Sequence, residues 1–162
     1  MRKLKKLNLI YGVGDVLHTH LNINPFAEEE IEDVLVRADI KDLSDFAEEA
    51  EVTEIIAKDV IDYLPLPQIE KALNHWVSRL RHGGTIVVGG TDLYEVAKDF
   101  SQYRMDITTA VKLLHGEQTK PYLIKRANFT VTGMVDYLSS MGLEIQKKRV
   151  NNHAMIVEAK RP

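Results

Sequence analysis

The chain has 162 residues, of which 44% are hydrophobic and 28% are charged, and it contains no cysteine. This size and composition predict one globular domain over residues 1–162, and the lack of thiols excludes disulfides, thiolate zinc sites and cysteine nucleophiles. The net charge of −3 disfavours broad electrostatic binding of nucleic acid, and the apolar runs are too short to cross a membrane. We therefore expect a cytoplasmic protein with no membrane association.

Short apolar segments dominate the first ninety residues and predict the parallel strands of an α/β sheet. They comprise residues 6–10, 21–24, 34–38, 54–57 and 85–89. A helix is predicted over residues 66–80, where Pro67 suits the first turn and apolar residues recur at helical spacing. Only eight residues, 13–20, are available between the first two strands, so we expect the crossover helix there to be short or irregular.

The second half of the chain changes from crossovers to a hairpin. Helices are predicted over residues 93–100, 107–115 and 130–141, the last opened by Thr130 and closed by Gly142. Residues 143–150 and 153–160 alternate between polar and apolar around a pair of asparagines. This pattern predicts an antiparallel hairpin at one edge of a mostly parallel sheet.

The first predicted strand ends in a glycine turn formed by Gly12 and Gly14. Glycine has no side chain to keep a ligand away from the backbone, and it accepts a positive φ. The pair therefore indicates either a ligand-binding turn or a tight structural turn between strand and crossover.

Several segments share their pattern with one known family. Residues 7–12 read LNLIYG, residues 38–43 read ADIKDL and residues 76–84 read WVSRLRHGG. The chain resembles the class I S-adenosylmethionine-dependent methyltransferases, in particular a compact subgroup whose first motif begins Leu-Asn-Leu-Gly-Cys-Gly. The resemblance covers nearly the whole chain and implies a single-domain Rossmann-like methyltransferase fold with S-adenosylmethionine as cofactor.

The resemblance implies cofactor contacts at the positions that match the family motifs. These positions are Gly12, Gly14, Asn24, Asp39, Ile40 and Asp59. Two positions depart from the motif, because Ile10 replaces its first glycine and Asn24 replaces the acidic residue that accepts hydrogen bonds from the ribose. For Asp39, contact with the adenine amino group competes with a local turn cap.

The acceptor side of the site is less well defined. Asp62 and Tyr63 follow the fourth strand and are the candidate catalytic residues. Asp62 could instead cap the turn before Pro65, and Tyr63 could serve in packing. Asp92 and residues 114–126 would also face the acceptor.

One basic segment stands out within residues 114–126. It holds Lys120, Lys125 and Arg126, with Tyr122 between them. These cations would hold an anionic substrate or, as is more common for such a run, form a solvated loop.

The six histidines show no ligand spacing typical of a metal site, so no metal is expected. The leading hypothesis is a S-adenosylmethionine-dependent methyltransferase acting on a small-molecule or sugar-type acceptor. The alternative is a catalytically inactive methyltransferase-like module for binding or assembly, which the changes at Ile10 and Asn24 motivate. The residues do not indicate the acceptor or the oligomeric state.

Overall fold

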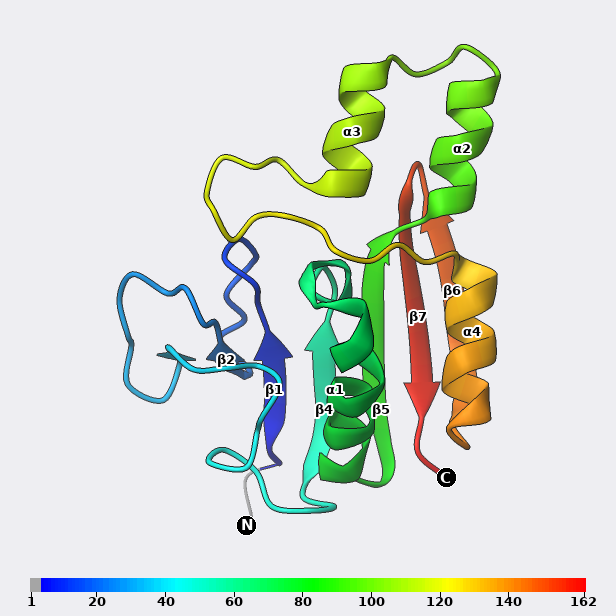
Figure 1. Ribbon diagram of the computed structural model, residues 1–162. Helices are drawn as coiled ribbons and strands as arrows, with labels where there is room; N and C mark the ends of the chain where they lie inside the picture. Colours follow the sequence, from blue (N-terminus) through cyan, green and yellow to red (C-terminus); the bar gives the residue numbers. More distant parts are fainter. Residues whose placement is uncertain (1–3) are drawn as a thin grey trace.

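The computed structural model describes residues 4–162, which build a seven-stranded sheet in the order β3-β2-β1-β4-β5-β7-β6 (Figure 1). The strands are β1 (Lys6–Leu9), β2 (Leu21–Ile23), β3 (Leu35–Val36), β4 (Val52–Ala57), β5 (Leu80–Thr91), β6 (Glu144–Asn151) and β7 (Ala154–Lys160). Strands β1 to β5 pair in parallel, whereas β7 is antiparallel to both β5 and β6. The predicted parallel sheet with a C-terminal hairpin is confirmed.

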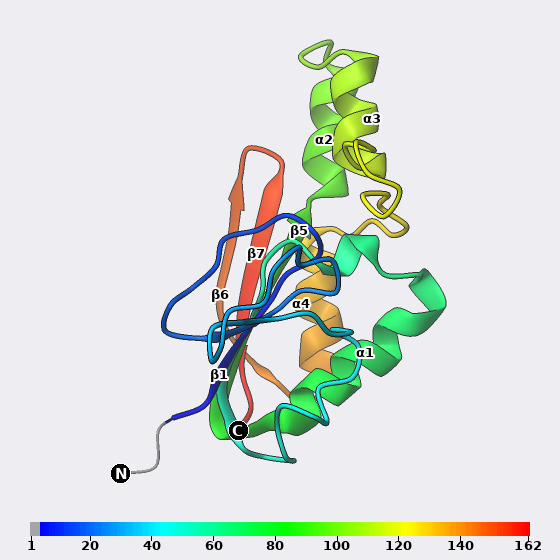
Figure 2. The same cartoon turned by 90° about the vertical axis from the view of Figure 1, so that its left-hand side faces the viewer.

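The helices are distributed unevenly over the sheet. They are α1 (Leu66–Arg79), α2 (Leu93–Ser101), α3 (Ile107–His115) and α4 (Val131–Ser140), with a short 3-10 turn, η1 (Ile61–Tyr63). Figure 2 shows α1 and α4 on the same face of the sheet, while α2 and α3 project beyond its end. Within residues 4–162, no helix is long and apolar enough to cross a membrane.

The hydrophobic core lies between the sheet and the α1–α4 layer. Ile55 and Ala57 of β4 and Ile86 and Val88 of β5 are fully buried on this face. Ile56 of β4 and Thr85 and Val87 of β5 point to the opposite face and are only half-buried. That period of two follows from the pleat, and burying the apolar set stabilises each strand against the helices.

The predicted helix between β1 and β2 is wrong, because the connection contains no helix. Two buried asparagine side chains supply the hydrogen bonds that a helix would have made internally. Asn8 Nδ2 donates to Asp15 O at 2.9 Å, while Asn22 Oδ1 accepts from Leu17 N at 2.9 Å. Asn8 Nδ2 also donates to Asn22 Oδ1 at 2.8 Å, which links the two strands that hold the loop.

The predicted boundaries are mostly close to the observed ones, with two differences. β5 begins at Leu80, directly after α1, and extends to Thr91, so it is longer at both ends than the predicted strand at residues 85–89. The hairpin turn comprises Asn152 and His153, and Asn152 adopts φ 55°. Asparagine tolerates this left-handed conformation better than most residues, which explains the abrupt reversal there.

Candidate functional site

A cavity of about 500 Å³ opens at the carboxyl edge of the parallel strands. Pro25 and Phe26 after β2, Asp39 and Ile40 after β3, and Arg126 from a later loop contribute to its walls. Ligands of open α/β sheets bind at this edge, and the volume lies in the range of cofactor sites. The structure therefore brings two of the predicted cofactor residues, Asp39 and Ile40, to one cavity.

Asp39 also makes the local contact that the alternative interpretation required. Its Oδ1 accepts a hydrogen bond from Lys41 N at 2.9 Å, and its side chain remains 59% exposed. One carboxylate oxygen thus shapes the turn after β3. The other oxygen lies 3.8 Å from Lys41 Nζ and stays accessible at the cavity wall.

Asn24 braces the glycine turn. Its Oδ1 accepts hydrogen bonds from Gly12 N and Phe26 N, both at 3.0 Å, and its Nδ2 donates to Gly12 O at 3.3 Å. A carbonyl oxygen has two lone pairs, so both acceptor positions of the amide are occupied. A ribose hydroxyl could donate to Asn24 only after one of these bonds is released.

Residues 116–127, here called the strap, cross over the same glycine turn. Gly12 adopts φ 78°, and a Cβ built at this position would lie 2.5 Å from Tyr122 Cε2. The Tyr122 ring stacks on Phe26 with 3.8 Å between ring centroids and 4° between planes. The turn therefore needs glycine both for its backbone conformation and for the close approach of the strap.

Gly14 and Asp59 belong to a second cavity, of about 260 Å³. Ile10 also lines it, and a Cβ on Gly14 would lie 3.1 Å from Ile10 Cγ2. The branched side chain that replaces the first motif glycine thus fills the space beside Gly14. The six predicted cofactor positions consequently fall into three groups: Asp39 with Ile40, Gly12 with Asn24, and Gly14 with Asp59.

Asp62 is fully buried beneath the acceptor side of the site. Its Oδ2 accepts from Thr91 N at 2.8 Å and lies 3.5 Å from Lys125 Nζ, while Oδ1 has no hydrogen-bond partner among the described residues. Burial raises the pKa of Asp62 to about 6, although Thr91 and Lys125 oppose this shift. Its side chain does not cap the turn before Pro65, so that alternative is wrong.

Lys125 fastens the strap to the sheet. Its side chain is only 9% exposed, and Nζ donates to Thr91 Oγ1 at 2.8 Å and lies 3.9 Å from Asp59 Oδ1. The carbonyl oxygen of Asp62 also accepts from the backbone N–H groups of Arg126 and Ala127, at 2.6 and 3.0 Å. The interpretation of this basic segment as a solvated loop is therefore wrong for Lys125, which is buried because it is paired.

Tyr63 is part of an aromatic cluster, defined as Tyr11, Phe26, Tyr63 and Tyr122. Its ring stacks on Tyr11 with centroids 5.0 Å apart, and Tyr11 contacts Phe26 edge to face at the same distance. Burial raises the pKa of Tyr63 to about 12, so the phenol stays protonated at neutral pH. Sequence reasoning missed this cluster, because its four rings lie on four separate segments of the chain.

Asp92, predicted to face the acceptor, is buried and caps α2. Its Oδ1 accepts from Tyr94 N at 3.0 Å, which satisfies one of the free N–H groups of the first helical turn. No group of three or more His, Asp or Glu residues suited to a metal ion occurs within residues 4–162.

No protein-family model matches the sequence, and no curated protein matches it either. Solved structures do match over almost the whole chain. A SAM-dependent methyltransferase from Archaeoglobus fulgidus has a TM-score of 0.61 at 9% identity, with 98% of this chain and 86% of that chain covered. One from Methanosarcina mazei has a TM-score of 0.61 at 11% identity, with 99% and 94% covered.

A third similar structure contains bound ligands. It is a Burkholderia thailandensis 1,6-didemethyltoxoflavin-N1-methyltransferase with 1,6-didemethyltoxoflavin and S-adenosylhomocysteine, and its TM-score is 0.61 at 9% identity. The alignment covers 98% of this chain and 72% of that one. The strand order and these likenesses agree with the fold that the sequence motifs implied. The chain therefore has the fold of the SAM-dependent methyltransferases.

Proposed function

We propose that the protein is a S-adenosylmethionine-dependent methyltransferase that acts on a small-molecule acceptor. The observation that carries the proposal is the cavity of about 500 Å³ at the carboxyl edge of this methyltransferase-like sheet, with Asp39 and Ile40 in its wall. The similar structure with S-adenosylhomocysteine and a small heterocycle supports the same class of ligand. The absence of thiols suits the reducing cytoplasm, which we propose as its location.

The residues present fit the adenosine end of the cofactor. Phe26 and Pro25 provide apolar surface, and the accessible oxygen of Asp39 is a hydrogen-bond acceptor for an amino group. The cofactor would supply a methyl group bonded to a cationic sulfur. An acceptor nucleophile can bond directly to this methyl carbon, with the sulfur as the leaving group. Such chemistry demands alignment of donor and acceptor more than a dedicated catalytic base.

Protein groups on the acceptor side can orient a substrate. Tyr63 offers a phenol that stays protonated, and Asp59 presents an exposed carboxylate 3.9 Å from Lys125 Nζ. Asp62 acts from below by holding Lys125 and the strap in place. We therefore assign contact with the acceptor to Tyr63 and Asp59, and a positioning role to Asp62.

Access to the glycine turn requires the strap to move. Tyr122 covers Gly12, and Asn24 is occupied by the backbone of the same turn. A ligand that reaches this turn must displace the Tyr122 ring from Phe26. We therefore expect Tyr122→Ala to accelerate cofactor association, because the substitution removes the stacked ring without altering the wall formed by Asp39.

The test is calorimetric titration with S-adenosylmethionine and S-adenosylhomocysteine, with NAD as the control ligand. We expect saturable binding of the first two ligands and its loss in Asp39→Ala. The matched control is Asp45→Ala, which removes an exposed carboxylate from the same β3–β4 connection and lies outside the cavity. Stopped-flow measurement of association rates compares the wild type with Tyr122→Ala.

Two results would count against the proposal. Equal losses in Asp39→Ala and Asp45→Ala would show that Asp39 makes no specific contact. Absence of binding in both the wild type and Tyr122→Ala, each with a cooperative unfolding transition, would mean that the cavity does not accept the cofactor. The fold would then serve as a module without methyltransferase activity.

A further inference from the structure

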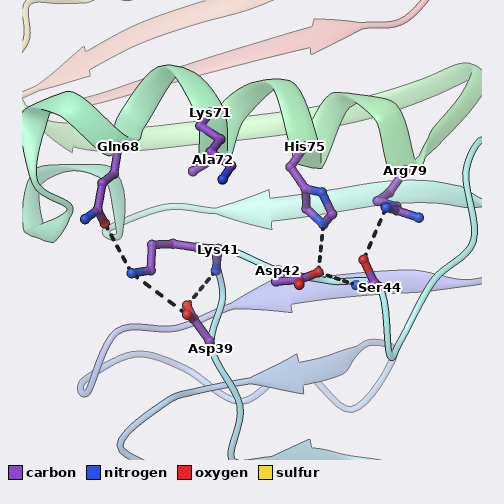
Figure 3. A pocket seen from close by; sticks show the side chains of 9 residues that line it. All are labelled: Asp39, Lys41, Asp42, Ser44, Gln68, Lys71, Ala72, His75 and Arg79. Carbon is purple, nitrogen blue, oxygen red and sulfur yellow. Dashed lines mark hydrogen bonds and ion pairs between the residues drawn. The ribbon is translucent and has the colours of Figure 1, made fainter.

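A larger cavity, of about 530 Å³, lies between residues 39–44 and one side of α1 (Figure 3). It is separate from the glycine turn and from the acceptor side of the proposed active site. Its walls share Asp39, Lys41 and Gln68 with the cofactor cavity, so the two spaces adjoin. Its far end is built from polar side chains for which the proposed methyl transfer has no role.

Cationic and neutral nitrogen groups line the α1 side of this cavity. Lys71, His75 and Arg79 follow one another at intervals of four residues and therefore share one side of the helix. Figure 3 shows them facing the segment that carries Lys41 and Ser44. The two walls thus present side-chain donors to the same space.

Two of these donors lack a protein acceptor. Arg79 donates from Nη1 to Ala47 O at 3.2 Å and from Nη2 to Ser44 Oγ at 3.3 Å, but its buried Nε has no partner among the described residues. Lys71 likewise makes no hydrogen bond or ion pair within residues 4–162. The Lys71 side chain is exposed to this space, so a ligand that supplies an oxygen there gains a charge-assisted hydrogen bond.

The acidic residues of the cavity are engaged in shaping its rim. Asp39 Oδ1 accepts from Lys41 N, and Asp42 Oδ1 accepts from Ser44 N at 3.0 Å. The side chain of Asp42 is 71% exposed, and that of Asp39 also faces solvent, so water screens both charges.

His75 is neutral and contributes no charge to the cavity. Its Nε2 accepts from Leu43 N at 2.8 Å, which requires the neutral tautomer with the proton on Nδ1. Burial, with a further contribution from Arg79, lowers the pKa of His75 and favours this neutral form. The side chains that line the cavity therefore carry a net positive charge, with Lys41, Lys71 and Arg79 against Asp39 and Asp42, and Lys71 is a donor without an acceptor among the described residues.

We propose that this cavity binds the phosphate group of a small anionic ligand. A phosphate carries oxygens in tetrahedral directions, which suits donors that converge from a helix on one side and a turn on the other. A planar carboxylate would meet fewer of them. The volume exceeds that of a phosphate alone, so a phosphorylated small molecule fits as well. The inference goes beyond the proposed methyl transfer and does not depend on it.

Calorimetric titrations with inorganic phosphate and with adenosine 5′-monophosphate, at constant ionic strength, test this inference. We expect saturable binding of at least one probe. Lys71→Ala should weaken its affinity about tenfold or more, because the substitution removes one charge-assisted hydrogen bond. Arg79→Lys keeps the charge but removes the guanidinium group at the cavity wall, and should weaken binding as well. Lys147→Ala, on exposed β6, is the matched control and should bind like the wild type.

The two probes distinguish the sources of the phosphate group. Tighter binding of the nucleotide than of inorganic phosphate would identify a phosphorylated nucleoside, whereas equal affinities would identify recognition of phosphate alone. Either result supports the site if Lys71→Ala weakens the binding, whereas binding that Lys71→Ala leaves unchanged would belong to the adjoining cofactor cavity and would overturn the inference. It is overturned if neither probe binds saturably, or if Lys147→Ala weakens binding as much as Lys71→Ala. Thermal unfolding of each variant separates loss of the site from loss of the fold.

Discussion

The carboxyl group of Asp62 should make the stability of this protein depend on pH. Its pKa is raised from 3.8 to about 6, chiefly by burial. This difference corresponds to about 3 kcal/mol. Because the raised pKa belongs to the folded state, Asp62 contributes stability that is fully present below pH 3.8 and is lost as the pH rises through about 6.

The substitution Asp62→Asn isolates this contribution. It keeps the shape of the side chain and the oxygen that accepts from Thr91 N, but it cannot take up or release a proton. Urea unfolding gives the free energy of unfolding of both proteins across the acid and neutral range. The wild-type value minus the variant value should fall by about 3 kcal/mol in full, and by about 1.3 kcal/mol between about pH 5 and pH 7.

Asp106→Asn provides the control. Asp106 caps α3, and the hydrogen bond from Thr109 N lowers its pKa, so its contribution is present at neutral pH and is lost only as the pH falls below 3.8. Its difference curve should therefore be level between about pH 5 and pH 7. A level curve for Asp62→Asn over the same range would refute the reasoning, because the carboxyl group would then not be desolvated.

Three further substitutions test contacts elsewhere in the fold. Gly12→Ala should destabilise the protein by about 1 to 3 kcal/mol in urea unfolding, because φ is 78° and the new Cβ would meet Tyr122; a loss of the same size in a Tyr122→Ala background would show that this contact is unimportant. Trp76→Phe removes the 2.7 Å hydrogen bond to Ile40 O and should cost about 1 to 3 kcal/mol by circular dichroism, and an unchanged midpoint would contradict the bond. Thr130→Ala removes the cap of α4 and should lower stability by about 1 kcal/mol in thermal unfolding, whereas Thr130→Ser should retain most of it.

The elements that the sequence predicted best depend on neighbours within a few residues. The helix over residues 66–80 has Pro67 in its first turn and a periodic apolar face, and the structure places α1 at Leu66–Arg79. The hairpin over residues 143–160 likewise follows from alternation and two asparagines. The sequence predicted a helix between β1 and β2 that the structure does not contain. Its replacement depends on Asn8 and Asn22, which hydrogen-bond to each other from two different strands, so neither segment alone indicates it.

The site shows the same division. The motif at residues 38–43 predicted the position of Asp39 after the third strand, and the structure places Asp39 in the cavity wall. The sequence did not predict that Asn24 Oδ1 accepts hydrogen bonds from both Gly12 N and Phe26 N. No local sequence pattern indicates which backbone groups a side chain will contact. The burial of Lys125 was hidden for the same reason, since its surroundings come from β4, β5 and the strap.

By itself, the sequence determined that the fold is a mostly parallel α/β sheet, with a helix after the fourth strand and an antiparallel hairpin near the C-terminus. Those properties follow from period, composition and turn residues, which act over short distances along the chain. Only the tertiary structure decided that Tyr122 lies over the glycine turn, that Asp62 is buried with a raised pKa, and that Lys71 and Arg79 face a cavity of their own. Desolvation and hydrogen-bond saturation depend on groups brought together from distant segments, so they are fixed only when the chain is packed.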